Sequence, residues 1–67
     1  MMNIRLEIEG LEEKETQERV RKQLEGMEGV WDVCMSREEK CVDVSYDDRT
    51  SDAEIHNHLQ NNGYKIY

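Results

Sequence analysis

Four side chains at the start of a predicted helix have the chemistry to bind a hard metal ion. Residues 10–16 read Gly-Leu-Glu-Glu-Lys-Glu-Thr, which supplies the carboxylates of Glu12, Glu13 and Glu15 and the hydroxyl of Thr16. Calcium takes about six to eight oxygen ligands, and the Asp-x-Asp-x-Asp-Gly spacing of a calcium loop is missing. Free backbone N–H groups and the helix dipole also favour acidic side chains at a helix start. We therefore expect these acids to stabilise the helix, and the hard-ion site is the alternative.

Two cysteines form a candidate redox pair or displaced two-thiolate site. Cys34 lies between Val33 and Met35 in an alternating run, and Cys41 precedes a second such run. Period-two geometry puts both thiols on the sheet face opposite the helices, as cross-strand or diagonal neighbours. A four-coordinate metal would need further ligands, and the spacing of six residues between the cysteines is not a zinc motif. We expect two reduced thiols on an open face, with a redox pair or thiolate site as alternatives.

The histidines and the tryptophan are weaker candidates. His56 and His58 are two residues apart on a predicted helix, so they point in different directions, unlike the i, i+4 pair of a helical zinc site. We expect His56 to be exposed and His58 to flank the buried stripe. Trp31 opens a predicted edge strand, where it either anchors a partner protein or covers the rim of the core. No nucleophile is paired with a base and no phosphate loop is present, so we predict no catalytic residues and no enzyme activity.

The spacing of apolar residues predicts six elements that position these side chains. Period-two alternation predicts strands at 3–10, 29–36, 40–48 and 64–67, and the polar residues 37–40 make the middle two a hairpin. Helical spacing predicts a helix at 14–26, and a Ser-x-x-Glu capping box at 51–54 begins a second helix that ends at Gly63. This order predicts an α+β ferredoxin-like βαββαβ sandwich, a four-stranded antiparallel sheet with two helices on one face. We expect one domain over residues 1–67.

The charge balance excludes several partner classes. The chain has 9 Lys and Arg residues against 16 Asp and Glu residues, a net charge of -7 that repels nucleic acid and anionic bilayers. Acylphosphatases and RNA-recognition modules share the predicted topology, but the positively lined loop of the former and the basic and aromatic sheet positions of the latter are missing. No apolar run approaches the roughly 18 residues of a membrane span, and residues 1–10 lack the basic flank and the apolar stretch of a signal peptide. We predict a cytoplasmic protein with no nucleic-acid or membrane partner.

A set of core and turn positions has the spacing of a known family: Gly10, Val20, Leu24, Gly29, Val30, Val33, Gly63 and Tyr64. In these residues the chain resembles the heavy-metal-associated domain of copper chaperones and metal-pumping ATPases. That family carries Gly-Met-x-Cys-x-x-Cys at the first helix, and here Leu11 replaces the methionine while Glu13 and Thr16 stand where the thiols belong. Tyr64 matches a tyrosine that lies beside the metal loop in many bacterial members. Copper(I) prefers sulfur to oxygen, so the resemblance implies the fold without soft-metal transfer.

The sequence therefore predicts a non-enzymatic protein-interaction module linked to metal transport or homeostasis, with no resident cofactor. The expected partner is another protein, such as a metal-transport component that carries the same fold, and the chain is expected to be a monomer or weak homodimer. Its contacts would be the acidic loop, the open sheet edges, Leu11, Trp31 and Tyr64. The alternative is a metallochaperone-like metal-ion carrier that uses either the loop from Glu12 to Thr16 or the face with Cys34 and Cys41.

Overall fold

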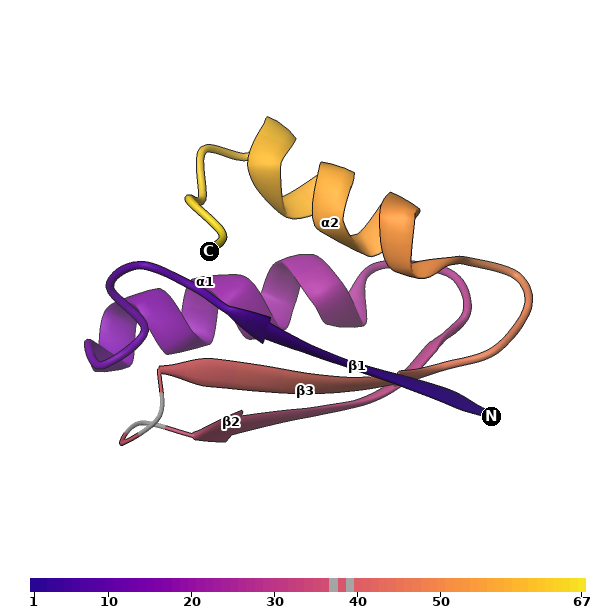
Figure 1. Cartoon of the computed structure of the whole chain (residues 1–67), viewed down its shortest axis with the longest axis horizontal. Helices are drawn as coiled ribbons and strands as arrows, with labels where there is room; N and C mark the ends of the chain where they lie inside the picture. Colours follow the sequence, from indigo (N-terminus) through magenta and orange to yellow (C-terminus); the bar gives the residue numbers. More distant parts are fainter. Residues whose placement is uncertain (37, 39) are drawn as a thin grey trace.

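The chain folds as strand, helix, strand, strand and helix in a computed structural model that describes residues 1–36, 38 and 40–67. The elements are β1 (Met2–Glu7), α1 (Lys14–Glu25), β2 (Val30–Ser36), β3 (Cys41–Tyr46) and α2 (Asp52–Asn61). Both helices lie on one face of the sheet (Figure 1). The predicted α+β ferredoxin-like class is confirmed. Of the predicted turn at 37–40, residues 37 and 39 lie outside the described residues.

The register of the sheet puts apolar residues on the helix face and polar residues on the other. Across the described residues, the strand order is β1-β3-β2, and both pairings are antiparallel. Val44 on the central strand pairs with Ile4 on one side and Val33 on the other. Because side chains alternate along a strand, a slip of one residue would expose this whole row, and the register is fixed by burial. We call the side of the sheet away from the helices the outer face.

The predicted fourth strand is wrong in extent, since the part of the chain that the structure describes forms three strands. The segment after α2 makes a single antiparallel bridge, between Ile66 and Ile8. Its flanking bonds are Glu9 N–H to Lys65 O (3.0 Å) and Tyr67 N–H to Glu7 O (2.9 Å). The N–H of Tyr64 donates to Leu59 O in α2, because this residue still closes the helix end. The segment therefore pairs only with the end of β1 and the residues just after it.

Both helices begin and end close to the predicted positions. In α1, Val20 and Leu24 are buried four residues apart. In α2, the Ser51 hydroxyl accepts a hydrogen bond from the N–H of Glu54 (3.2 Å), which confirms this half of the predicted capping box. Within the part of the chain described, no helix has the length and apolar character needed to cross a lipid bilayer.

One apolar cluster fills the space between the sheet and the helices. Every structural element contributes to it, and so do residues between elements: Leu6, Ile8, Leu11, Val20, Leu24, Val33, Val42, Val44, Tyr46, Ile55 and Leu59. Ile8 and Leu11, which flank the turn at Gly10, are both fully buried. The loop between β1 and α1 is thereby held to the core at each end, which fixes where α1 begins.

Candidate functional site

The acidic loop, residues 10–16, turns sharply into α1. The N–H of Glu13 donates to Gly10 O (3.0 Å), and the N–H of Gln17 donates to Glu13 O (3.0 Å). The side-chain amide of Gln17 also donates to Leu11 O (2.8 Å), which holds the loop against the first turn of the helix. Glu13 occupies the N-cap position, but its side chain makes no capping hydrogen bond.

Leu11 is part of the core. It has 0% exposure, so the structure contradicts its predicted role as an interaction residue. The turn at Gly10 directs the side chain inward, where it joins Ile8 and Leu24 in the apolar cluster. Sequence reasoning assigned Leu11, which replaces the methionine of the family motif, to the interaction residues, although a single apolar residue in a charged loop also fits a core anchor.

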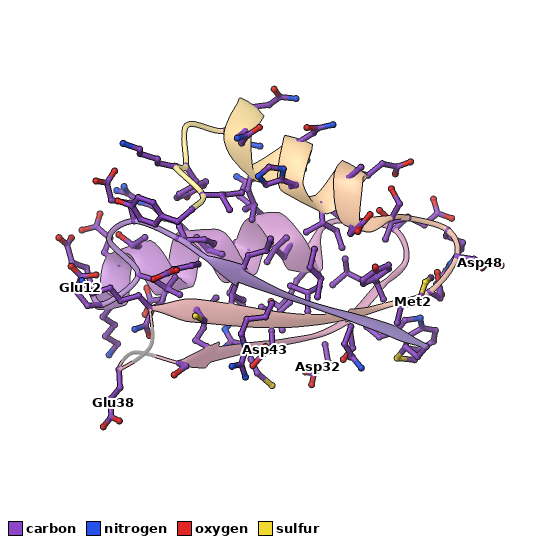
Figure 2. All side chains as sticks on the ribbon, in the orientation of Figure 1. Met2, Glu12, Asp32, Glu38, Asp43 and Asp48 are labelled. Carbon is purple, nitrogen blue, oxygen red and sulfur yellow. The ribbon has the colours of Figure 1, made fainter. Side chains whose placement is uncertain are left out.

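The acids of the loop are exposed and do not form an ion cage. Glu12, Glu13 and Glu15 are exposed, Glu15 pairs with Arg19 one helical turn away, and Thr16 is half-buried. Figure 2 shows Glu12 at the outside of the molecule, near the start of α1. Among residues 1–36, 38 and 40–67, no three His, Cys, Asp or Glu side chains are placed to hold one metal ion. The geometry therefore offers helix-start stabilisation and no preformed hard-ion site.

The cysteines are diagonal neighbours on the outer face. Cys34 pairs with Asp43, and Cys41 pairs with Ser36, so the two thiols lie one row apart on adjacent strands. Within the described residues, neither cysteine forms a disulfide. The Cys34 Sγ donates to Asp32 Oδ2 (3.5 Å). This hydrogen bond and the negative charge of Asp32 raise the pKa of the Cys34 thiol, which leaves it a poor nucleophile at neutral pH.

The outer face around the thiols is polar. Arg5 Nε donates to Asp43 Oδ1 (2.8 Å), and this bond lowers the pKa of the Asp43 carboxyl. Ser45 Oγ donates to Asn3 Oδ1 (2.7 Å) in the next row. Asp32 and Asp43 extend on the side of the sheet away from the helices (Figure 2). Side-chain hydrogen bonds between β1 and β3, and one within β2, therefore satisfy part of this face internally.

Trp31 is exposed and held in place at the other end of the molecule. The register of β2 against β3 shifts between Val30 and Asp32, which leaves Trp31 as the extra residue of a bulge. Its side chain is 61% exposed, yet its Nε1 donates to Asp47 Oδ2 (2.6 Å) and the Arg49 guanidinium lies 5.9 Å from the ring centroid. Contact with a cation and a carboxylate limits the motion of the indole.

Asp47 connects the parts of this site, and sequence reasoning missed it. Its carboxylate accepts from the backbone N–H (2.9 Å), Nε and Nη2 of Arg49, while Arg49 Nη1 approaches Glu28 Oε1 at 3.8 Å. The hydrogen bonds from Arg49 and Trp31 hold the pKa of Asp47 well below its usual range. The sequence signal was the hairpin itself, since the residue after β3 must lie beside the residues that open β2. We call Met2, Glu28, Trp31, Asp47 and Arg49 the Trp31 surface.

The structure does not bring the acidic loop and the Trp31 surface together. Figure 2 shows Met2 and Asp48 at one end of the molecule and Glu12 at the other. Met2 pairs with Tyr46, which pairs with Val30 beside Trp31, so these residues share the same end of the sheet. The predicted contacts therefore form separate surfaces.

Tyr64 and the histidines lie around α2. Tyr64 is half-buried and packs against the core. His58 is half-buried beside the buried stripe, as predicted. His56 was predicted to be exposed, but it is half-buried, because it faces a pocket between α2 and β1. Neither histidine belongs to a cluster of three metal-ligating residues in the part of the chain described.

The whole chain has the fold of solved metal-handling domains. The CopZ metallochaperone is 22% identical, with 98% of this chain and 100% of that chain covered and a TM-score of 0.87. Oxidized MerP from Ralstonia metallidurans CH34 is 24% identical, with 98% and 93% covered and a TM-score of 0.85. A chain of the Atx1-Cu(I)-Ccc2a complex is 18% identical, with 97% and 90% covered and a TM-score of 0.84.

The likeness to these proteins is one of fold. No protein-family model matches the sequence, and no curated protein sequence matches it. At this level of identity, the likeness defines the class of fold, a small α+β ferredoxin-like domain, and the function has to be argued from the side chains of this chain.

Proposed function

We propose that this chain is a non-enzymatic protein-docking domain, over residues 1–67, that serves metal transport or homeostasis and docks through the Trp31 surface. The observation that carries the proposal is the indole of Trp31, which is 61% exposed and bound by Asp47 and Arg49. An aromatic side chain that is already ordered loses little conformational freedom on binding. Tryptophan is also enriched among the residues that dominate binding energy at protein interfaces.

The charge of the chain supports a basic protein partner. A net charge of -7 accelerates encounter with a positive surface and makes the complex sensitive to salt. The partner is a component of metal transport, and its domain carries the same fold. One chain with this fold is found in the Atx1-Cu(I)-Ccc2a complex, so the fold is compatible with an interface to another protein.

The composition of the acidic loop supports docking over copper transfer. Glu13 and Thr16 take the positions of the two thiols in the family motif, and their oxygen atoms are poor ligands for a soft cuprous ion. Tyr64, which matches the family's tyrosine beside the metal loop, is a packing residue in this chain and is half-buried against the core. The domain works in the cytoplasm as a monomer or weak homodimer.

A residue-by-residue metal titration tests docking against the carrier alternative. The reduced, ¹⁵N-labelled chain is titrated with copper(I), zinc and calcium, and its amide shifts are followed. A docking domain gives no saturable shifts at residues 12–16 or at Cys34 and Cys41. Saturable shifts at either place would assign the chain to the metal carriers instead.

A second titration tests the docking surface itself. The probes are purified domains of this fold from metal-transport proteins encoded in the same genome, added at low and high ionic strength. We expect shifts at Trp31 and Asp47 that weaken as salt rises and are lost in Trp31→Ala. Gln60→Ala is the control, because Gln60 is also exposed, on α2, and lies outside the Trp31 surface. Binding that ignores Trp31→Ala, or no binding of any such domain, would overturn the proposal.

A further inference from the structure

A pocket of about 290 Å³ opens between β1 and α2. Its apolar floor is formed by Ile4 and Leu6 of β1 and by Ile66 of the C-terminal segment. Its remaining lining residues are Asp52, Ala53, His56 and Tyr67. Leu6 belongs to the core, and Ile4 and Ile66 pack against it while remaining partly exposed. We call this pocket the β1 groove.

The β1 groove runs beside a free edge of the sheet. In the described residues β1 has β3 on one side, and on the other side only the bridge from Ile66 to Ile8, just beyond the strand. The backbone groups of Glu7 and Glu9 bond to the C-terminal segment, whereas the N–H of Ile8 bonds to Lys40 O on the opposite side. Because backbone groups alternate along an antiparallel strand, those of Asn3 point the same way as those of Glu7, toward the free edge.

A strand placed along this edge would also cover the groove. In the four-stranded form of the fold, the last strand runs along β1, and its inward side chains pack under α2. In this chain, the N–H of Tyr67 donates to Glu7 O, and among the described residues no strand lies beside the earlier part of β1 on this side. Exposed edges of this kind accept extended peptides, with the main chain giving affinity and side-chain pockets giving specificity.

The charges around the groove favour a basic occupant. Asp52 lines the groove at the start of α2. Near Tyr67, the carboxylates of Glu9, Glu7 and Glu12 add negative charge. Desolvation first, and then the negative charge of these carboxylates, raises the pKa of Tyr67. A second copy of the chain would bring the same net charge of -7 to this edge, whereas a basic segment is attracted to it.

We propose that the β1 groove binds an extended, basic segment of a partner protein. The segment adds to β1 as an antiparallel strand, and one of its apolar side chains packs over Ile4, Leu6 and Ile66. The inference rests on the docking function proposed above and gives it a second surface. The bridge between Ile8 and Ile66 is antiparallel, so the added strand continues the orientation already present. Residues of the segment with side chains on the outer face direct their N–H groups to β1, and residues with side chains in the groove direct theirs away.

A pair of synthetic peptides tests the charge preference. Ac-KVKIKVK-amide carries apolar residues for the groove and lysines for the outer face, and Ac-EVEIEVE-amide reverses the charge. Titration into the ¹⁵N-labelled full chain is expected to shift Asn3, Leu6 and Ala53 with the lysine peptide only. Equal binding of the two peptides, or shifts confined to other residues, would overturn the proposal.

Backbone pairing is tested by N-methylation of the lysine peptide. Methyl groups on the two lysines beside the isoleucine remove donors that face β1, and we expect affinity to fall by about tenfold or more. Methylation of the isoleucine and one valine removes donors that face away from β1, so affinity is expected to stay within about twofold of the parent peptide. If both methylated peptides bind equally well, the segment does not add as a strand.

Matched variants of the chain test whether the peptide binds in the β1 groove. Ala53→Arg fills the groove from an exposed helix position, and Asn61→Arg makes the same change of charge at an exposed position outside it. We expect about tenfold weaker peptide binding for Ala53→Arg and less than about twofold for Asn61→Arg. If the chain dimerises as its concentration rises, and Ala53→Arg abolishes the dimer, then the groove binds a second copy of the chain and the proposal is overturned. Docking of partner domains through Trp31 without any peptide binding would refute the groove and leave the proposed function in place.

Discussion

The indole N–H of Trp31 donates a 2.6 Å hydrogen bond to the carboxylate of Asp47, across the open end of the hairpin formed by β2 and β3. The same carboxylate accepts hydrogen bonds from the backbone N–H, Nε and Nη2 of Arg49, whose guanidinium lies over the indole. An exposed aromatic residue, an acid and a base thus form one ordered group. The group has no catalytic chemistry, but it presents a fixed aromatic surface to solvent.

Asp47 is expected to make the stability of the domain depend on acid. Its pKa is lowered in the folded chain by hydrogen bonds from Arg49 and Trp31, so its contribution is present above the unfolded value of about 3.9. That contribution is lost as the pH falls from about 4 toward the folded pKa. We expect Asp47→Asn to flatten the acid limb of a plot of Tm against pH, with the exposed Asp48→Asn as the control. An unchanged acid limb in Asp47→Asn would contradict the ordered group.

Gly29 supports the same group through its backbone. At φ +97°, an added Cβ would lie 3.0 Å from Asp47 Oδ1 and 3.1 Å from the backbone N of Thr50. Gly63 has a similar φ of +90°, but an added Cβ there meets nothing within 4 Å. We expect Gly63→Ala to cost about 1 to 3 kcal/mol from backbone strain alone, and Gly29→Ala to cost more.

Urea unfolding of the two glycine variants measures this difference. If Asp47 has to move to admit the new methyl group, Gly29→Ala should also lower the fluorescence anisotropy of Trp31, and Gly63→Ala should not. Equal destabilisation of the two variants would show that the close approach of Gly29 to Asp47 and Thr50 adds nothing to the cost of Gly29→Ala.

Leu11 is expected to behave as a core residue. Because its side chain has 0% exposure, Leu11→Ala should lower the free energy of unfolding by about 2 to 5 kcal/mol. Leu11→Met, which restores the residue of the family motif, conserves volume and should cost less than about 1.5 kcal/mol. Denaturant titrations followed by far-ultraviolet circular dichroism give both values. A change in the free energy of unfolding near zero for Leu11→Ala would contradict the burial of this residue.

The fold could be predicted from the sequence because periodicity and turn residues agree. Val42 and Val44 alternate with polar residues and are buried, and Val20 and Leu24 lie one helical turn apart on the buried side of α1. These patterns depend on local geometry alone. The fourth strand could not be predicted in extent, because the N–H of Tyr64 is taken by the end of α2.

The candidate sites were harder to predict because they depend on contacts between elements. The partnership of Trp31 with Asp47 follows from the hairpin register, which a bulge shifts by one residue. The position of Leu11 depends on the turn at Gly10, and the half-burial of His56 depends on how α2 crosses β1. Spacing along the chain gives the type of each side chain, but packing decides which residues meet.

Cys34 is expected to react slowly at neutral pH. Asp32 raises the pKa of its thiol by accepting a hydrogen bond and by its charge, so less reactive thiolate is present. Asp32→Asn should therefore increase the rate of alkylation of Cys34 at pH 7, measured by mass spectrometry, and Asp48→Asn should leave it unchanged. An unchanged rate in Asp32→Asn would show that the carboxylate does not control this thiol.

The diagonal relation of Cys34 and Cys41 also predicts that they resist pairing. Diagonal neighbours on adjacent antiparallel strands have Cα atoms roughly 7 to 8 Å apart, beyond the roughly 4.4 to 6.8 Å of most disulfides. Incubation with oxidised glutathione is expected to give mixed disulfides and no intramolecular bond. Ready formation of an intramolecular disulfide would restore the redox hypothesis.

The acidic loop offers a gain-of-function test of the proposed link between fold and metal. Glu13→Cys with Thr16→Cys places two thiols one helical turn apart at the start of α1, where the helix dipole stabilises thiolates. In a background of Cys34→Ser and Cys41→Ser, we expect this variant to hold copper(I) against a colorimetric chelator that strips the parent. Glu12→Cys with Glu15→Cys has the same thiol spacing from exposed positions and should bind more weakly. The parent here is the Cys34→Ser, Cys41→Ser chain with Glu13 and Thr16 unchanged. Tight copper(I) binding by this parent would mean that oxygen ligands of the loop bind the cuprous ion, and it would contradict the docking proposal.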